Sequence, residues 1–178
     1  INNKTLALLF GITLTNMPGI VDKDSGIEYL RKEMQCFHSL LPSGAHFLCS
    51  FDTCQNEEKM MKAYNHPKHG KFIESITYKI KKDLSLDDGF DETAWFYNPK
   101  WDAKNHMFRH TITSTKEMIF AIDNHTFHLP RGHNILSYMS VKFPVEIYLK
   151  IFEESGFKLA TRPFVGSDGN IMMTLLQA

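Results

Sequence analysis

A short segment after the first apolar run of the chain is the first candidate for a ligand-binding site. The run ends at Gly11, and the residues after it lead to Asn16. Ligands of open α/β sheets bind at the carboxyl ends of the strands, so a site is expected here. Asparagine is also a common turn residue. From residue type alone, Asn16 could bind a ligand, close a turn or cap a helix.

Histidine, serine and cysteine raise three other kinds of chemistry. The pairs His106/His110 and His125/His128 lie in segments with strand character, where their spacing does not bring side chains together as on a helix. No metal site is therefore expected, and the absence of a nucleophile elbow argues against a hydrolase. The cysteines are odd in number, lack C-x-x-C spacing and are predicted to be reduced thiols: Cys36, Cys49 and Cys54.

The bulk properties favour a globular protein that binds a small partner. Twenty basic and twenty acidic residues cancel, so no large uniform field would attract nucleic acid or an anionic membrane. No apolar run approaches the roughly 20 residues needed to span a bilayer. The start of the chain lacks a signal-peptide layout. A cytoplasmic location is expected.

The first part of the chain has the pattern of a strand, a helix and a second strand. Residues 5–11 are continuously apolar, as in a strand that a parallel sheet covers on both faces. Ser25 and Glu28 form a capping box before a helix that is expected to reach residue 41. Residues 46–52 predict a second buried strand. This order predicts a right-handed crossover.

The middle of the chain changes from helical to strand character. Residues 56–64 predict a short helix that Pro67 closes. A second helix is expected from about residue 71, with apolar residues at four-residue steps to Leu84. Short strands are then predicted at residues 95–97, 107–113, 118–122 and 126–129. Together these strands indicate a small antiparallel sheet lobe.

The α/β pattern resumes near the carboxyl end. Residues 135–143 are extended, and Pro144 is expected to open a helix that Gly156 terminates. Residues 157–165 and 171–176 are predicted to form a β-hairpin.

One segment of this pattern resembles a known family. Residues 9–16 read L-F-G-x-T-L-x-N and are similar to the F-G-S-x-I-G-N segment of SAM-dependent histidine Nα-methyltransferases of ergothioneine synthesis. The segment also resembles the fungal relatives that methylate dimethylallyl-tryptophan. The similarity continues in order through residues 62–65, 95–98, Met107 and 140–143 to the closing hairpin. A sheet that is parallel until a final hairpin is also characteristic of SAM-dependent methyltransferases.

The resemblance implies the fold and its division. The expected class is α/β: the second half of a Rossmann-like class I methyltransferase sheet that ends in an antiparallel β-hairpin, with an inserted α+β substrate lobe. The predicted boundaries are 1–64 for the first part of the core, 65–140 for the inserted substrate-recognition lobe, and 141–178 for the last helix and hairpin.

The resemblance also implies the roles of particular residues. Gly11 and Asn16 would line an amino-acid pocket, with Asn16 bonded to the α-amino and carboxylate groups of the substrate. Tyr64 would bind the carboxylate through its hydroxyl, and Asn16 and Tyr64 would thereby orient the amine as the catalytic residues. Met107 and Ser140 would line the side-chain end. Methyl transfer needs a neutral amine lone pair aimed along the S–CH₃ axis, and positioning can supply much of the acceleration.

Three positions depart from the family pattern. Tyr138 stands where histidine-specific members place a glutamate that bonds the imidazole, so a larger or more apolar amine than histidine is expected to bind. Thr15 replaces the glycine before the pocket asparagine and adds bulk. Gln55 replaces the lysine of an Asp-x-x-Lys segment that begins here at Asp52.

The cofactor-binding residues of the family match positions upstream of Ile1, and these 178 residues contain no G-x-G-x-x-G motif. We therefore expect a SAM-dependent N-methyltransferase that acts on the amino group of an amino acid or related small amine, represented by its carboxy-terminal portion. SAM is the expected cofactor of the complete protein, and this chain alone should bind SAM poorly. The alternative is a non-catalytic remnant or binding module that self-associates through an exposed sheet edge and does not bind SAM.

Overall fold

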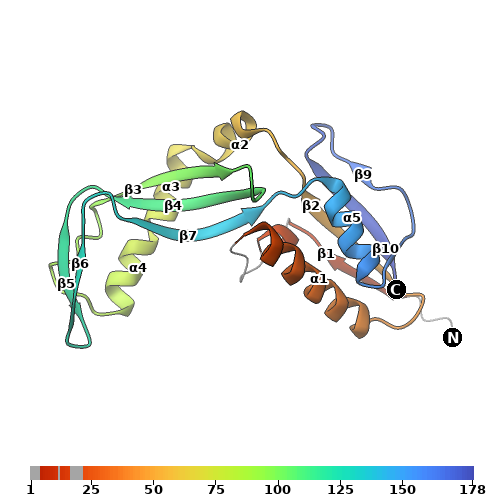
Figure 1. Ribbon diagram of the computed structural model, residues 1–178, viewed down its shortest axis with the longest axis horizontal. Helices are drawn as coiled ribbons and strands as arrows, with labels where there is room; N and C mark the ends of the chain where they lie inside the picture. Colours follow the sequence, from red (N-terminus) through yellow and green to blue (C-terminus); the bar gives the residue numbers. More distant parts are fainter. Residues whose placement is uncertain (1–4, 12, 17–21) are drawn as a thin grey trace. The chain divides into compact units, whose positions relative to one another are not determined.

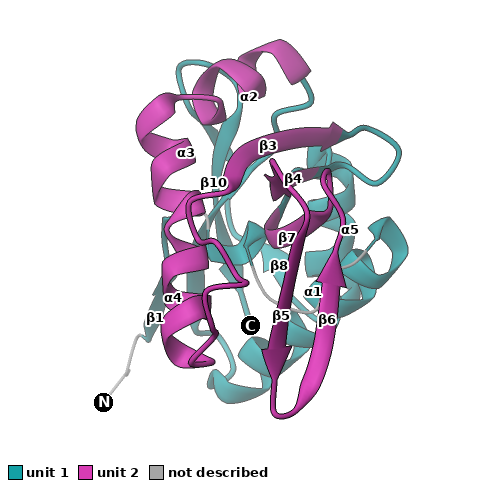
Figure 2. Ribbon diagram, turned by 90° about the vertical axis from the view of Figure 1, so that its left-hand side faces the viewer, with its two compact units in different colours: residues 1–56, 102–107, 140–178 teal, residues 57–101, 108–139 magenta. Residues whose placement is uncertain are grey.

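The chain divides into two compact units in the computed structural model, which describes residues 5–11, 13–16 and 22–178. Unit 1 comprises residues 1–56, 102–107 and 140–178, and unit 2 comprises residues 57–101 and 108–139 (Figure 2). The predicted lobe, 65–140, differs from unit 2 at its edges and at an internal segment. Residues 57–64 belong to unit 2, whereas residues 102–107 and Ser140 belong to unit 1.

Unit 1 is built on a mixed sheet. The first two strands, β1 (Leu6–Leu9) and β2 (His46–Asp52), run parallel, and η1 (Thr13–Thr15) and α1 (Lys23–Leu40) lie between them in the chain. Strand β10 (Ile171–Gln177) pairs antiparallel with β2 and also with β8 (Lys158–Leu159) and β9 (Phe164–Val165). The order β1-β2-β10-β8 confirms the α/β class and the terminal antiparallel hairpin (Figure 1).

The helices α1 and α5 (Val145–Glu154) pack on the same face of this sheet. Phe47 and Phe51 alternate on one side of β2. The ring of Phe37 on α1 stacks on Phe47 at 5.4 Å between centroids, and Tyr148 on α5 lies 4.4 Å from Phe51. Gly156, at a φ of +96°, follows α5 as predicted and turns the chain away.

The opposite face of β1 is exposed, which corrects the prediction of a strand covered on both faces. Leu6 and Leu8 are each 55% exposed. The physical reason is that both described helices of unit 1 contact the side of β2 that carries Phe47 and Phe51. In register with β1, Leu8 lies beside Leu48 of β2.

The predicted start of α1 is also wrong in detail. The capping box joins Asp22 and Ser25: the Ser25 N–H donates to Asp22 Oδ1 at 2.8 Å, and the Asp22 N–H donates to Ser25 Oγ at 3.0 Å. Aspartate and serine are about equally favourable at the N-cap position of a helix. The helix therefore begins at Lys23, earlier than a cap at Ser25 would place it.

Unit 2 begins with three short helices rather than two. These are α2 (Glu57–Tyr64), α3 (Pro67–Glu74) and α4 (Ile76–Asp83). Pro67 was expected to close a helix, but it opens α3, because its fixed φ and missing N–H suit the first turn. The single helix expected from about residue 71 is interrupted at Ser75, whose hydroxyl donates to the Phe72 carbonyl at 2.6 Å.

The strands of the middle region form two small sheets. One has the order β3-β4-β7, and the other is the β5–β6 hairpin. Their bounds are β3 Trp95–Asp102, β4 Met107–Ser114, β5 Met118–Ile122, β6 His125–Leu129 and β7 Asn134–Val141. The strand predictions are confirmed in place, although β3 extends five residues beyond the predicted 95–97.

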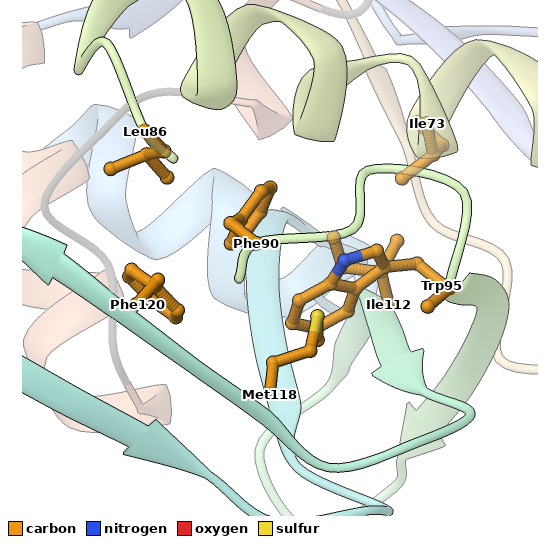
Figure 3. Close-up of a cluster of buried hydrophobic side chains, with 8 residues drawn as sticks. Ile73, Leu86, Phe90, Trp95, Ile112, Met118 and Phe120 are labelled. Carbon is orange, nitrogen blue, oxygen red and sulfur yellow. The ribbon is translucent and has the colours of Figure 1, made fainter. Parts of the chain in front are cut away.

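A buried apolar cluster holds unit 2 together. Figure 3 shows side chains from α3, from the segment between α4 and β3, and from β3, β4 and β5 gathered around Trp95 and Phe90. Phe90 packs edge-on against Phe120 with 5.2 Å between ring centroids. The cluster consists of Ile73, Leu86, Phe90, Ala94, Trp95, Ile112, Met118 and Phe120.

Candidate functional site

The segment after β1 presents Asn16 to solvent. Gly11 has a φ of +77°, a left-handed conformation that favours glycine, and no heavy atom lies within 4 Å of where a Cβ would be. The Thr13 hydroxyl donates to the Phe10 carbonyl at 2.8 Å, and the Asn16 N–H donates to the Thr13 carbonyl at 3.1 Å. These bonds hold the turn. Asn16 is an exposed residue. Ile12, within the family-like segment, lies outside the described residues.

Asn16 is joined to a buried chain of polar groups within unit 1. The Ser140 hydroxyl donates to Asn16 Oδ1 at 2.6 Å, and Lys142 Nζ donates to Ser140 Oγ at 3.2 Å. Lys142 Nζ also donates to Asp52 Oδ2 at 2.6 Å, and the Cys54 N–H donates to Asp52 Oδ1 at 2.8 Å. The chain of bonds links the segment after β1 to the carboxyl end of β2.

The lysine and aspartate in this chain form a desolvated ion pair. The side chain of Lys142 is 0% exposed and that of Asp52 is 10% exposed. Removing one partner of such a pair leaves an uncompensated buried charge, which destabilises a protein by about 3–5 kcal/mol. The pair therefore fixes both side chains firmly.

The backbone of Lys142 is held from two sides. Its N–H donates to the His106 carbonyl at 2.8 Å, and Gln55 Nε2 donates to its carbonyl. Gln55 Oε1 lies 2.7 Å from His106 Nδ1, and an amide oxygen only accepts, so this nitrogen carries the proton. Burial, followed by the charge of Lys23, lowers the pKa of His106. Gln55, the departure from the family lysine, thus ties His106 to the strand that carries Ser140.

The second group of predicted residues surrounds His110 in unit 2. His110 is fully buried on the central strand β4. The Tyr138 ring stacks on the imidazole with 3.9 Å between centroids, and the Tyr64 ring meets it edge-on at 5.0 Å. The Tyr97 hydroxyl lies 2.7 Å from His110 Nδ1. The structure therefore brings Tyr64 and Tyr138 to a common histidine.

Burial sets the protonation of this aromatic group. Burial, followed by the effect of Tyr64, raises the pKa of Tyr138 to about 12. Burial also raises the pKa of Tyr97 and lowers the pKa of His69, whose Nε2 lies 3.5 Å from the Tyr138 hydroxyl. Neutral forms are favoured at each of these positions, so the group presents hydroxyls and rings rather than a charge.

The structure distributes the six predicted site residues between the units. Gly11, Asn16, Met107 and Ser140 belong to unit 1, and Tyr64 and Tyr138 belong to unit 2. It joins Asn16 to Ser140 directly. Met107 is fully buried, so a ligand would reach it only after its neighbours moved. The roles of all six residues in binding stay predictions.

Sequence reasoning missed three residues that the structure places beside the predicted ones. Asp52 ended a predicted buried strand, and Lys142 alternates with Ser140 along the chain, so both carried a signal. His110 lies within the predicted strand of residues 107–113, which by itself gives no signal of a site. Its significance depends on Tyr97 and Tyr138 of the flanking strands, and strand order was not predictable from spacing.

Asp52 is the acidic residue at the carboxyl end of β2. A carboxylate at the end of a strand is the natural partner for ribose hydroxyls. The carboxylate at the end of β2, Asp52, has both oxygens engaged, by Lys142 Nζ and by the Cys54 N–H. Within the part of the chain that the structure describes, no group of three or more histidine, cysteine or acidic residues could hold a metal ion. No helix in that part is long and apolar enough to cross a bilayer.

Two curated relatives from Aspergillus fumigatus are N-methyltransferases. N-methyltransferase fsqC is 26% identical over 152 residues, which cover 85% of this chain and 38% of the relative. The 4-dimethylallyltryptophan N-methyltransferase easF is 25% identical over 167 residues, which cover 88% of this chain and 46% of the relative. The chain thus spans less than half the length of these relatives.

Two solved structures align with almost the whole chain. One is a SAM-dependent methyltransferase from Clostridium acetobutylicum, with 13% identity and a TM-score of 0.46 over 99% of this chain and 59% of that one. The other is CalS10, an amino pentose methyltransferase from Micromonospora echinaspora, with 9% identity and a TM-score of 0.43 over 100% of this chain and 61% of that one.

The match to a protein family covers nearly all of the chain. Residues 2–178 match the family described as histidine-specific methyltransferase, SAM-dependent. The matched range includes the turn that carries Asn16, the Asp52–Lys142 pair and the aromatic group around His110. The chain belongs to this family of SAM-dependent methyltransferases.

Proposed function

We propose that this protein transfers a methyl group from SAM to the amino group of an amino acid or a related small amine. The observation that carries the proposal is the exposed Asn16 amide at the end of β1, whose oxygen accepts from the buried Ser140 hydroxyl. An amide held in this way can bind a polar substrate group with little loss of side-chain entropy. Family membership and the two N-methyltransferase relatives support the reaction type.

The contribution of these residues to the reaction is positional. SAM supplies the electrophilic methyl group when it is bound. Asn16 would hold the substrate through its side-chain amide. A fixed orientation of the amine lone pair can supply a large part of the acceleration without any covalent intermediate. The amine must be neutral when it reacts, so the released proton passes to solvent or buffer.

The aromatic group of unit 2 supports a substrate with an aromatic or apolar side chain. Tyr138 presents a neutral ring and hydroxyl at the position where histidine-specific members place a carboxylate. The relative easF is named for a prenylated tryptophan. We therefore expect tryptophan-like amino acids to be better substrates than histidine.

The proposal is tested by methyl-transfer kinetics of the full-length protein with histidine, tryptophan and simple amines. Asn16→Ala should raise KM for the preferred amino acid by roughly 10- to 100-fold, because a hydrogen bond to a charged group contributes about 1.5–3 kcal/mol. Gln35→Ala removes an exposed amide from α1 and serves as the matched control. Unchanged kinetics in Asn16→Ala would contradict the assignment of the site.

A second candidate, a self-associating binding module, is favoured by the exposed face of β1. Leu6 and Leu8 are each 55% exposed on a strand at the end of the sheet order. Exposed apolar edge strands favour association. If a second copy covers this face, Leu8→Lys should shift the chain towards the monomer in sedimentation velocity, whereas Leu40→Lys, at another exposed leucine, should not. Association that is equal in both variants would exclude this face.

A further inference from the structure

The buried ammonium of Lys142 controls the direction of the hydrogen bonds that lead to Asn16. A lysine ammonium has three donors and no acceptor. In the bond between Lys142 Nζ and Ser140 Oγ, the lysine is therefore the donor. A serine hydroxyl has a single proton. With Lys142 donating to its oxygen, the Ser140 proton is directed towards Asn16 Oδ1, 2.6 Å away.

The direction of these hydrogen bonds also fixes the orientation of the exposed Asn16 amide. Asn16 Oδ1 accepts the Ser140 proton, and this fixes which end of the amide faces inward. The Nδ2 group, with its two N–H donors, is then the end available to a ligand. A donor pair of this kind suits the carboxylate of an amino acid, because a bond to a charged acceptor is roughly twice as strong as a neutral one.

Asp52 holds the Lys142 side chain in place. Its Oδ2 accepts from Lys142 Nζ at 2.6 Å, and its Oδ1 is held by the Cys54 N–H at 2.8 Å. The pair is desolvated, with 0% of the lysine side chain exposed. A buried ion pair seldom adds net stability compared with apolar residues of the same volume. The positions of donor and acceptor in the pair, in contrast, determine the direction of the hydrogen bonds that reach Asn16.

Resting on the function proposed above, we propose that Lys142 is a positioning residue: through Ser140 it locks the Asn16 amide with its N–H donors towards the substrate. Lys142 contacts no reacting atom in this scheme. Without its ammonium, the Ser140 hydroxyl can rotate and the Asn16 amide can turn over. The turned amide would present an oxygen, which repels a carboxylate. The lock therefore selects amines that carry a carboxylate over otherwise identical amines that do not.

The test compares an amino acid with its decarboxylated analogue in the full-length protein. Tryptophan and tryptamine, or histidine and histamine, form such pairs. We expect Ser140→Ala and Lys142→Met each to raise KM for the amino acid about tenfold more than KM for the decarboxylated amine, which corresponds to about 1.4 kcal/mol. Lys150→Met, at an exposed lysine on α5, is the matched control and should change neither value.

Two further variants separate positioning from simple destabilisation. Asp52→Leu combined with Lys142→Met removes both buried charges, so the double variant can fold where Lys142→Met alone fails, and it should show the same selective rise. Ser140→Ala combined with Lys142→Met should be no worse than either single change, since both break one chain of bonds. Equal rises in KM for both substrates would overturn the inference. Additive effects of Ser140→Ala and Lys142→Met in the combined variant would overturn it as well.

The two proposals fail in different ways. A wild-type protein that methylates neither the amino acid nor the amine in the presence of SAM would overturn the proposed function. A wild-type protein that methylates amino acids, with a Ser140→Ala variant that loses no selectivity for the carboxylate, would overturn only the role of Lys142.

Discussion

At the scale of single residues, hydrogen-bond direction and protonation distinguish the two groups of predicted residues, one in each unit. In unit 1, a cation and an anion are buried together, and the order of donors and acceptors leads outward to Asn16. In unit 2, burial favours neutral His69 and Tyr138 side chains. The first arrangement is suited to a charged substrate group, and the second is suited to an aromatic or apolar one.

The lowered pKa of His69 predicts a loss of stability in mild acid. Burial holds this pKa below its ordinary value of 6.5, so the unfolded chain takes up the proton first as the pH falls. The contribution of His69 is complete above pH 6.5 and is lost as the pH falls through its folded-state pKa. Urea denaturation at pH 7 and pH 5 should show a smaller difference for His69→Gln than for wild type. Identical differences would show that His69 is not responsible.

The site was only partly predictable at this scale. Asn16, Tyr64, Tyr138 and Ser140 were predicted from the family-like segments, and the Asn16–Ser140 bond was not, because two residues far apart in sequence meet only after folding. Lys142 carried a signal only through its alternation with Ser140. Charged side chains are rarely buried unless they are paired, and the pairing with Asp52 depends on tertiary structure.

At the scale of elements, apolar periodicity predicted strands better than helix ends. Strands β2 and β5 have the predicted bounds, since alternating or continuous apolar runs mark them directly. The predicted helix boundaries were wrong where two local signals compete. Pro67 can follow one helix or open the next, and Ser75 interrupts an apolar pattern that continues across it.

The cluster around Trp95 predicts which strand positions stabilise unit 2. Ile112 on β4 is 0% exposed within the cluster, so Ile112→Ala should lower the free energy of unfolding by about 2–5 kcal/mol through lost burial and a residual cavity. Ile119 on β5 is 55% exposed, and Ile119→Ala should cost less than about 1 kcal/mol. Chemical denaturation of the two variants gives both values. Similar losses at the two positions would contradict the assigned core.

At the scale of the whole molecule, family membership accounts for the order of elements, and exposure shows where unit 1 differs from the predicted sheet. The helices α1 and α5 pack on the face of the sheet that carries Phe47 and Phe51. A sequence pattern reports that Leu6 and Leu8 are apolar, but it does not report which elements cover them. The exposed face of β1 is therefore a finding that needed the structure.

The central claim is that this protein methylates the amino group of an amino acid. The most direct measurement is mass spectrometry of the product formed by the full-length protein from isotopically labelled SAM and a tryptophan-like amino acid. We predict that the labelled methyl group is found on the α-nitrogen. A label on carbon, oxygen or a ring nitrogen, or no labelled product from any amino acid or small amine, would contradict the account.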